Sequence, residues 1–298
     1  MDSLIAIDVG GTVIKCALVA AGGFAIQHAE RHPTRAERGP DAVVERILTI
    51  AEGLAARGPA AAAGIVVPGI VDDVRGVAAY SANLGWRDVP LTSLVRERIG
   101  LPAALGHDVR TGGLAEARLG AGRGVEQLLF VPIGTGIAGA HVVAGHPFAG
   151  AHGAACELGH IVVRRDGRPC GCGRRGCLEA EASARAVATR YADATGEPVS
   201  AAEVAARALA GEAAASAVWQ ATVDALADGL LTAITLYDPQ LIVLGGGLAE
   251  AGDHLLKPLT EAIDARRTFE IVPDLVRAQL GDNAGCLGAA LLAEGALH

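Results

Sequence analysis

The chain has 298 residues, enough for two domains of ordinary size, and 51% of them are hydrophobic, enough to bury a sizeable core. Only 3% are aromatic, so that core must be aliphatic. The net charge is -8 and no block of Lys or Arg is present. This excludes the phosphate-dominated binding of nucleic acid as a main function.

The N-terminal segment indicates neither export nor membrane insertion. It lacks a positively charged region, and its first apolar run ends at Asp8, so no signal peptide is expected. The longest apolar stretch, residues 60–71, is interrupted by Gly64, Pro68 and Gly69. It is shorter than the roughly 18 residues that span a bilayer. We therefore expect a soluble, cytoplasmic protein without a membrane partner.

The first part of the chain alternates strands and helices. Hydrophobic periodicity predicts strands at 4–9, 14–19 and 64–68, a helix at 41–57, a helix at 91–99, a strand at 101–105 and a helix at 111–119. The strand at 101–105 delivers Asp108 near its end.

The second part begins with a unit that repeats the start of the chain. A strand at 128–133, the turn Gly134-Thr135-Gly136 and a strand at 138–143 match the first strand, turn and strand. Such a repeat suggests two domains of related design. The remaining elements are helices at 181–195, 201–210 and 213–237, a strand at 241–244, a glycine turn that opens a helix, and a last helix at 288–296.

The segment Asp8-Val9-Gly10-Gly11-Thr12 joins the first two expected strands. Glycines lack Cβ atoms, so a phosphate can lie against the backbone N–H groups of such a turn. Asp8 is suited to holding Mg²⁺ through water, because Mg²⁺ sheds its waters reluctantly. An ordinary glycine-rich hairpin with a solvated aspartate explains the same residues, and the pattern alone leaves both interpretations open.

Two further glycine turns are candidates for nucleotide binding. Residues 134–139 match the dinucleotide pattern G-x-G-x-x-G, but a strand follows instead of a helix, so we reject a Rossmann site and favour a second phosphate turn. Gly245-Gly246-Gly247 follows a buried strand and opens a helix, which suits adenosine or phosphates. A packing turn is the alternative there. No Walker A sequence is present.

Three of the six cysteines crowd into the segment Cys170–Cys177, which in a chain without a signal peptide favours a metal over disulfides. Cys170, Cys172 and Cys177 can converge on one Zn²⁺, and His160 offers the fourth ligand. A site with four protein ligands has no open position, so its role would be structural. Reduced free cysteines on a surface turn are the alternative. The others, Cys16, Cys156 and Cys286, are interpreted as buried small apolar residues.

Asp108 is a candidate catalytic base, because a hydroxyl group is a weak nucleophile and benefits from a carboxylate that accepts its proton. An aspartate between a strand and a helix is also a typical N-cap, and spacing alone favours that interpretation. Asn83, Glu157 and Glu179 are ordinary polar residues until something places them together.

Four segments, in this order, closely resemble the ROK family (repressor, open reading frame, kinase), whose members include glucokinases, fructokinases and N-acetylhexosamine kinases. They are Asp8–Thr12, Gly134–Ile137, Glu157–His160 and Cys170–Glu179. The resemblance covers nearly the whole chain. It implies a duplicated, two-domain α/β fold of the actin-like ATPase (ribonuclease H-like) type with a central cleft. The N-terminal lobe would comprise residues 1–110 plus 285–298, and the C-terminal lobe residues 111–284.

The resemblance also implies the chemistry, namely ATP-dependent phosphorylation of a hexose, with glucose as the first expectation, and Asp108 as the base. Sugar contacts would come from Asn83, His107, Asp108, Glu157, His160 and Glu179. ATP and Mg²⁺ would be held by Asp8, Gly10, Gly11, Thr12, Lys15, Gly134, Thr135, Gly136, Gly245, Gly246 and Gly247. His160 would bind structural zinc, with Cys170, Cys172 and Cys177, through one ring nitrogen and face the sugar with the other.

The chain departs from the family pattern at three places. His107 stands where these kinases usually carry an Asn that helps hold a sugar hydroxyl, which leaves glucose, mannose, fructose and N-acetylated hexosamines open. Thr111-Gly112-Gly113 is a weaker helix former than the usual alanine-rich segment, and Ala138 stands where glycine is common. None of these departures removes the base or the metal ligands.

Two other functions were weighed. ROK repressors carry an added N-terminal helix-turn-helix domain, for which the strand that begins at Leu4 leaves no room, so a non-catalytic sugar sensor is disfavoured. Kinases of this type that use polyphosphate tend to lack the cysteine-rich loop, so its presence favours ATP. The expected partners are a small sugar and ATP, and analogy with the family predicts a homodimer or homotetramer.

Overall fold

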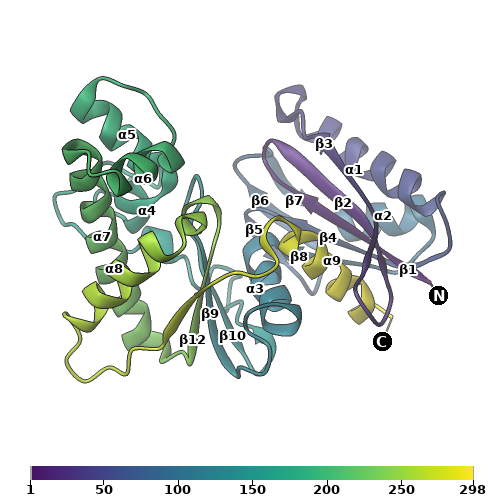
Figure 1. The fold of residues 1–298 in the computed structure, drawn as a ribbon. Coiled ribbons are helices and arrows are strands. Elements are labelled where there is room, and N and C mark those ends of the chain that lie inside the picture. Colours follow the sequence, from purple (N-terminus) through teal and green to yellow (C-terminus); the bar gives the residue numbers. More distant parts are fainter. Residues whose placement is uncertain (1, 298) are drawn as a thin grey trace. The chain divides into compact units, whose positions relative to one another are not determined.

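The computed structural model describes residues 2–297, and these form two compact units. The first unit takes the described residues up to 115, residues 147–155 and those from 282 onward, whereas the second takes 116–146 and 156–281. Each unit has its own five-stranded sheet and its own aliphatic core (Figure 1).

The sheet of the first unit has the strand order β3-β2-β1-β4-β8. In it β1 is antiparallel to β2 and parallel to β4, and β4 is parallel to β8. Its strands are β1 (Ser3–Val9), β2 (Val13–Ala20), β3 (Ile26–Pro33), β4 (Ala60–Val67) and β8 (Ala103–His107). A smaller sheet contains β5 (Ile70–Asp72), β6 (Val77–Ser81) and β7 (Trp86–Val89).

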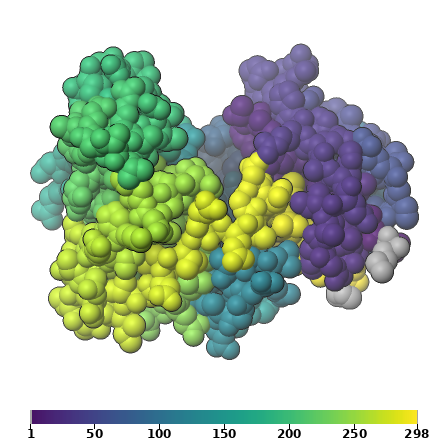
Figure 2. Space-filling model, viewed as in Figure 1, coloured from purple at the N-terminus to yellow at the C-terminus, as the bar shows by residue number. Residues whose placement is uncertain are grey.

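Helices complete the core of the first unit. Ile5 and Ile7 of β1 share an aliphatic cluster with Ile47 of α1. The C-terminal helix α9 packs against β1 and β4, so a Cβ at Gly64 would lie 1.8 Å from the carbonyl oxygen of Ala289 and only glycine fits there. Yellow C-terminal and purple N-terminal atoms therefore appear within one unit (Figure 2). The elements are η1 (Ala36–Arg38), α1 (Pro40–Ala55), α2 (Leu91–Ile99), α3 (Asp108–Leu119), η4 (Gly281–Asn283) and α9 (Ala284–Gly295).

The sheet of the second unit repeats the order of the first, as β11-β10-β9-β12-β13. Again the first central strand is antiparallel to the strand that follows its turn and parallel to the next. The strands are β9 (Gln127–Pro132), β10 (Ala140–Val143), β11 (His146–Pro147), β12 (Leu241–Gly245) and β13 (Asp274–Arg277). The helices are η2 (Leu158–His160), α4 (Leu178–Ala182), α5 (Ala184–Thr195), α6 (Ala201–Leu209), α7 (Ala213–Tyr237), η3 (Gly247–Ala251) and α8 (Asp253–Asp264).

Three local expectations need correction. The helix expected at 181–195 is two helices, because Ser183 ends α4 and caps α5 by accepting the N–H of Ala186 at 3.1 Å. The glycine turn after β12 opens a five-residue 3-10 helix, η3, before α8 begins. The edge strand β3 and the small sheet of β5, β6 and β7 were not predicted.

Within residues 2–297, none of the helices combines the length and apolar character needed to cross a bilayer.

Candidate functional site

The first glycine turn connects β1 to β2. It is closed by a hydrogen bond from the N–H of Gly10 to the carbonyl oxygen of Val13 (2.9 Å). Thr34, fully buried just beyond β3, holds the turn at two points. Its hydroxyl donates to the carbonyl oxygen of Gly10 (2.6 Å), and its N–H donates to that of Thr12 (2.8 Å). The turn is therefore anchored by side-chain and backbone bonds from a neighbouring segment.

Asp8, at the end of β1, lies in a partly buried group of charges. Burial raises the pKa of its carboxyl group, and Lys15 opposes that shift. Lys15 Nζ lies 3.9 Å from Asp8 and forms a closer ion pair with Asp282, which also pairs with Arg31. Helix α9 approaches Asp8 closely at Gly285. A Cβ at position 285 would lie 2.3 Å from Asp8 Oδ2, so glycine suits this position. The structure thus brings Asp8 and Lys15 together beside the first turn.

Asp108 is the first residue of α3, directly after β8. Its Oδ1 accepts the N–H of Val109 at 2.7 Å, and its side chain is 32% exposed. A carboxylate at this position can both orient itself on the helix and accept a proton from a group in solution. The two interpretations of Asp108, as a cap and as a base, are chemically compatible.

His107 is largely buried, with 12% of its side chain exposed, and is uncharged near neutral pH. Burial, with a smaller effect from Arg110, lowers the pKa of its imidazole to about 4. Its Nδ1 accepts the N–H of Arg110 at 3.3 Å, so the proton of the neutral ring is on Nε2. The 3.5 Å approach between His107 Nδ1 and Asp108 Oδ1 is consequently a contact and not an ion pair. His107 adds no positive charge beside Asp108 near neutral pH.

Arg110 is a buried cation that sequence reasoning did not single out. Its guanidinium donates to the carboxylate of Asp73 (3.1 and 3.2 Å) and to the carbonyl oxygen of Gly153 (2.8 Å). Its exposed fraction is only 4%. These bonds fix the start of α3, and therefore the backbone of Asp108, against two other segments of the first unit.

Asn83 belongs to the loop between β6 and β7 and is exposed. It lies beside the first turn, because a Cβ at Gly11 would be 3.6 Å from the Cβ of Asn83. The first unit therefore places one predicted sugar contact next to predicted phosphate-binding residues.

The second glycine turn, after β9, is held by a carboxylate. The N–H of Gly134 donates to the carbonyl oxygen of Gly136 (2.9 Å), and the N–H of Ile137 donates to Glu179 Oε2 (3.1 Å). A Cβ at Gly136 would lie 2.4 Å from the same oxygen, so a larger residue there would displace the Glu179 carboxylate from this position. Glu179, predicted to contact sugar, thus has a direct structural bond to the second turn.

The glycine turn after β12 lies against the second turn. The N–H of Ile133 donates to Gly245 (2.8 Å), and the N–H of Leu248 donates back to Ile133 (3.0 Å). Gly246 has a φ of 77°, and a Cβ there would lie 2.5 Å from the carbonyl oxygen of Ile133. The two predicted nucleotide turns of the second unit are therefore neighbours.

The cysteine segment forms a compact cluster with His160. Ligand atoms of His160, Cys170, Cys172 and Cys177 all lie within 4.8 Å of one another. His160 Nδ1 is 3.7 Å from Cys170 Sγ, and the sulfurs of Cys172 and Cys177 are 3.6 Å apart. Three sulfurs and one imidazole nitrogen are the donor set of a common structural zinc site, and the residues fit that ion.

The thiols of this cluster differ in acidity. The backbone N–H and then the side chain of Arg174 lower the pKa of Cys172 to about 6. Burial raises the pKa of Cys177 to about 12. The exposed end of the loop therefore carries a stabilised thiolate, the form that ligates metals. Cys16, Cys156 and Cys286 are buried free thiols, as predicted.

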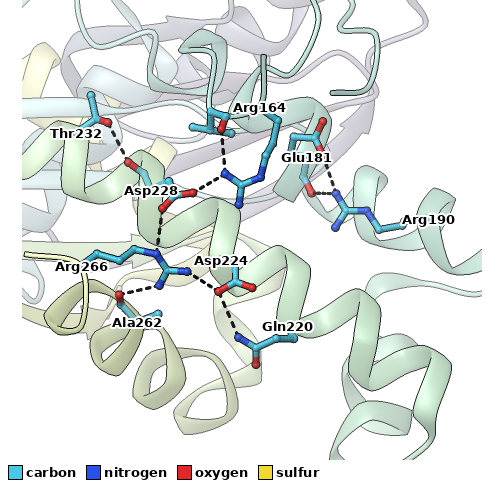
Figure 3. Close-up of polar contacts among 10 residues, drawn as sticks. Arg164, Glu181, Arg190, Gln220, Asp224, Asp228, Thr232, Ala262 and Arg266 are labelled. Carbon is cyan, nitrogen blue, oxygen red and sulfur yellow. Dashed lines mark hydrogen bonds and ion pairs between the residues drawn. The ribbon is translucent and has the colours of Figure 1, made fainter. Parts of the chain in front are cut away.

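Ion pairs fasten the segment that carries the cysteines to α7, and α7 in turn to Arg266, just after α8 (Figure 3). The backbone N–H of Arg164 donates to the carbonyl oxygen of Gly176 (3.1 Å), and its guanidinium pairs with Asp228 at 2.5 Å. Arg266 contacts Asp228 (3.1 Å) and Asp224 (2.6 Å) in turn. The network joins the loop to the long helix of the second unit.

A second fastening uses Glu181 of α4 (Figure 3). Its carboxylate pairs with Arg190 at 2.9 Å and accepts the backbone N–H of Arg168 at 2.7 Å. Glu181 is 7% exposed. The loop that carries the cysteines is thus held at its beginning and in its middle by charged hydrogen bonds.

Sequence reasoning missed Thr34, Arg110 and Asp282. Arg110 follows Asp108 by two residues, and this closeness in sequence is the signal that could have identified it. Asp282 and Lys15 are 267 residues apart in the sequence, and no local pattern connects them. In the first unit, Asp8, Lys15 and Asn83 lie beside the first turn, and in the second, Glu179 lies beside the second turn and His160 lies among the cysteines. Glu157 directly precedes η2, and its carbonyl oxygen accepts the N–H of His160 at 3.0 Å.

The chain is similar to known proteins over nearly its full length. The sequence model described as "ROK family" matches residues 4–296. A glucokinase from Thermotoga maritima is 33% identical, over 96% of each chain. An N-acetylmannosamine kinase from Escherichia coli O139:H28 is 32% identical, over 98% of each chain. A ROK family glucokinase from Streptomyces griseus, solved in complex with glucose and AMPPNP, is 30% identical with a TM-score of 0.84, over 98% of this chain and 99% of that one.

These matches cover nearly the whole chain. The fold is the actin-like ATPase fold of ROK kinases. The chain belongs to the ROK family.

Proposed function

We propose that the chain is a sugar kinase that transfers the γ-phosphate of ATP to a hexose hydroxyl, with glucose as the first substrate and glucose 6-phosphate as the product. The glucokinase relative and the glucose and AMPPNP complex of the Streptomyces griseus protein support this. The observation that carries the proposal is the Asp108 carboxylate at the end of β8, in the sheet whose first hairpin bears the glycine turn.

Asp108 is assigned the role of general base. As the sugar hydroxyl oxygen forms a bond to the γ-phosphorus, the bond from that phosphorus to the ADP oxygen breaks, and the hydroxyl proton passes to the Asp108 carboxylate. The N–H of Val109 orients one oxygen of that carboxylate. His107 stays neutral and does not weaken the basicity of Asp108 by adding charge.

The glycine turns are assigned to the nucleotide. We propose that ATP is bound by the three glycine turns and by the two charged residues beside the first turn, namely Asp8, Gly10, Gly11, Thr12, Lys15, Gly134, Thr135, Gly136, Gly245, Gly246 and Gly247. Magnesium, when bound with ATP, neutralises phosphate charge. Burial raises the pKa of Asp8, and a cation bound nearby would favour the charged carboxylate.

The sugar contacts are proposed as Asn83, His107, Asp108, Glu157, His160 and Glu179. His160 presents Nδ1 to the cysteines, which leaves Nε2 on the other edge of the ring for a sugar hydroxyl. Zinc held by His160, Cys170, Cys172 and Cys177 would fix the ring and the loop. The N-acetylmannosamine kinase relative makes N-acetylmannosamine the second sugar to test.

We further propose lobes of residues 1–110 plus 285–298 and of residues 111–284, a cytoplasmic location, and assembly as a homodimer or homotetramer. Light scattering coupled to gel filtration measures the assembly directly.

The deciding experiment is a coupled assay with ATP, or with polyphosphate, across glucose, mannose, fructose and N-acetylmannosamine. We expect turnover of glucose with ATP, and a kcat about a thousandfold lower in Asp108→Asn, because positioned bases contribute factors of that order. Asp88→Asn, an exposed aspartate of the same unit, serves as the control. Equal rates for the parent and Asp108→Asn would remove the base assignment.

A further inference from the structure

A surface cavity of about 390 Å³ in the first unit is lined by β3, η1 and α1. None of the residues proposed for ATP, sugar or zinc belongs to it. Its polar lining contains four arginines, Arg35, Arg38, Arg46 and Arg57, together with His32, Glu30 and Glu45. The wall also includes the apolar residues Ala42, Ile50 and Leu54.

Both carboxylates of the lining already have cationic partners. Glu30 accepts hydrogen bonds from His28 and His32, and it pairs with Arg57. These bonds, that of His28 above all, lower the pKa of Glu30 to about 2. Glu45 forms a two-pronged pair with Arg98, at 2.9 and 3.0 Å. Because these two carboxylates pair with Arg57 and Arg98, they do not neutralise the charges of the other arginines that line the cavity.

Three arginines remain without a protein partner. Among residues 2–297, the side chains of Arg35, Arg38 and Arg46 form no ion pair or hydrogen bond. The Nε of Arg46 is buried with its donor unused, which costs free energy unless a ligand or water accepts from it. Arg35 holds a left-handed backbone, with φ of 58°, that a non-glycine residue rarely adopts. Three guanidinium groups and no free acid make an anion the fitting occupant.

We propose that this cavity binds a small phosphate ester. Guanidinium groups donate paired hydrogen bonds that match phosphate oxygens, and a phosphate dianion is the simplest group that accepts from three of them at once. The apolar wall at Ala42, Ile50 and Leu54 accommodates a carbon skeleton, and the volume lies in the range of small-molecule sites. The occupant is a phosphorylated metabolite, distinct from the ATP and sugar of the proposed reaction.

The cavity is connected to the first glycine turn. Arg35 follows Thr34, whose hydroxyl and N–H bind the carbonyl oxygens of Gly10 and Thr12. An anion that orders Arg35 therefore acts one residue from the anchor of the turn. This coupling step rests on the proposed kinase function, and it predicts that the phosphate ester changes the KM for ATP.

Calorimetric titration of the full chain with ribose 5-phosphate and with inorganic phosphate tests the site, with AMPPNP and glucose present to occupy the proposed active site. We expect the Kd of ribose 5-phosphate to rise about tenfold or more in Arg38→Gln and in Arg46→Gln, since each loses charged hydrogen bonds. Arg96→Gln, an unpaired exposed arginine on α2, is the matched control and should bind as the parent does. Arg46→Lys keeps the charge and should retain more affinity than Arg46→Gln.

Several outcomes overturn the proposal. They are the absence of binding at about 20 mM ester, equal affinity in Arg38→Gln and Arg46→Gln with a native melting temperature, and equally tight binding of gluconate, a carboxylate of similar size. The KM for ATP is then measured with and without the ester in the parent and in Arg46→Gln. An unchanged KM removes the coupling alone. A chain without kinase activity fails the proposed function, whereas calorimetry still decides the site.

Discussion

The two sheets share one strand order but fasten their glycine turns differently. In both, a central strand leads through a glycine turn to an antiparallel neighbour. A neutral threonine, Thr34, anchors the first turn, whereas the Glu179 carboxylate anchors the second. The strand arrangement is thus repeated, but the anchoring side chains are not. Each turn is held by a different neighbouring segment, the one after β3 in the first unit and α4 in the second.

The units also differ in how their functional loops are held. The first unit relies on a largely aliphatic core that extends to strand β7, where Trp86 is buried. The second adds a Cys/His cluster and a network of ion pairs around a loop with little core of its own. Perturbing each device should therefore affect its own unit.

The largest effect is expected from the metal cluster. Purified protein should contain about one zinc per chain, and Cys172→Ser should lose it and about 2 to 5 kcal/mol of unfolding free energy. Hydrogen exchange should increase at residues 160–178 and stay unchanged in β1. Cys286→Ala, a buried cysteine of the first unit, should keep the zinc. A metal-free parent with the stability of the variant would show that the units do not differ in this way.

On acidification, His107 is expected to reduce the free energy of unfolding by about 3 kcal/mol. The native pKa is near 4 and the ordinary value is 6.5, so only the unfolded chain gains a proton between these values. Stability is therefore lost as pH falls from 6.5 toward 4, at about 1.4 kcal/mol per unit, and His107 contributes no pH dependence above 6.5. Urea unfolding of the parent and of His107→Asn at about pH 7.5 and 4.5 measures this. An identical loss in both proteins would contradict it.

The smallest losses of stability are expected from removing the side chains that anchor the two turns. We expect the second turn to lose more than the first. Glu179→Ala removes a charged acceptor, worth about 2 kcal/mol, whereas Thr34→Val removes a neutral bond, worth about 1 kcal/mol. Exchange of the Ile137 amide should accelerate about thirtyfold in the first variant. Thr34→Val should raise the exchange rate in the first turn only about fivefold. The reverse order would show that the charged anchor is not the stronger one.

Much of the fold was predictable because aliphatic runs and glycines mark strands and turns. Helix α7 has the predicted bounds, and β1, β2 and β9 agree to within about a residue. The edge strand β3 carries polar side chains on both of its faces, such as His28 and Glu30 on one and Arg31 on the other, so its sequence lacks the apolar alternation that marks a strand. Gly112 and Gly113 weaken local helix propensity, yet α3 is continuous because its packing outweighs that preference.

The candidate site divides in the same way. The Cys/His cluster was predictable because its cysteines are close in sequence, and the structure groups the four ligands. The partners of Lys15 and the anchors of the two turns depend on contacts between distant segments, which no local pattern contains. The assignment of Asp108 as the base remains a prediction for the kinetic test.

The position of α9 has a consequence for how the protein is made. This helix belongs to the first unit, yet it follows the whole of the second unit in the sequence, and Gly64 and Asp8 accept it only through close contacts at Ala289 and Gly285. While a ribosome is still translating residue 284, the apolar face of β1 and β4 lacks its cover. Nascent chains should thus complete their second unit before the first, and translational stalling near residue 284 would leave an aggregation-prone, chaperone-dependent species.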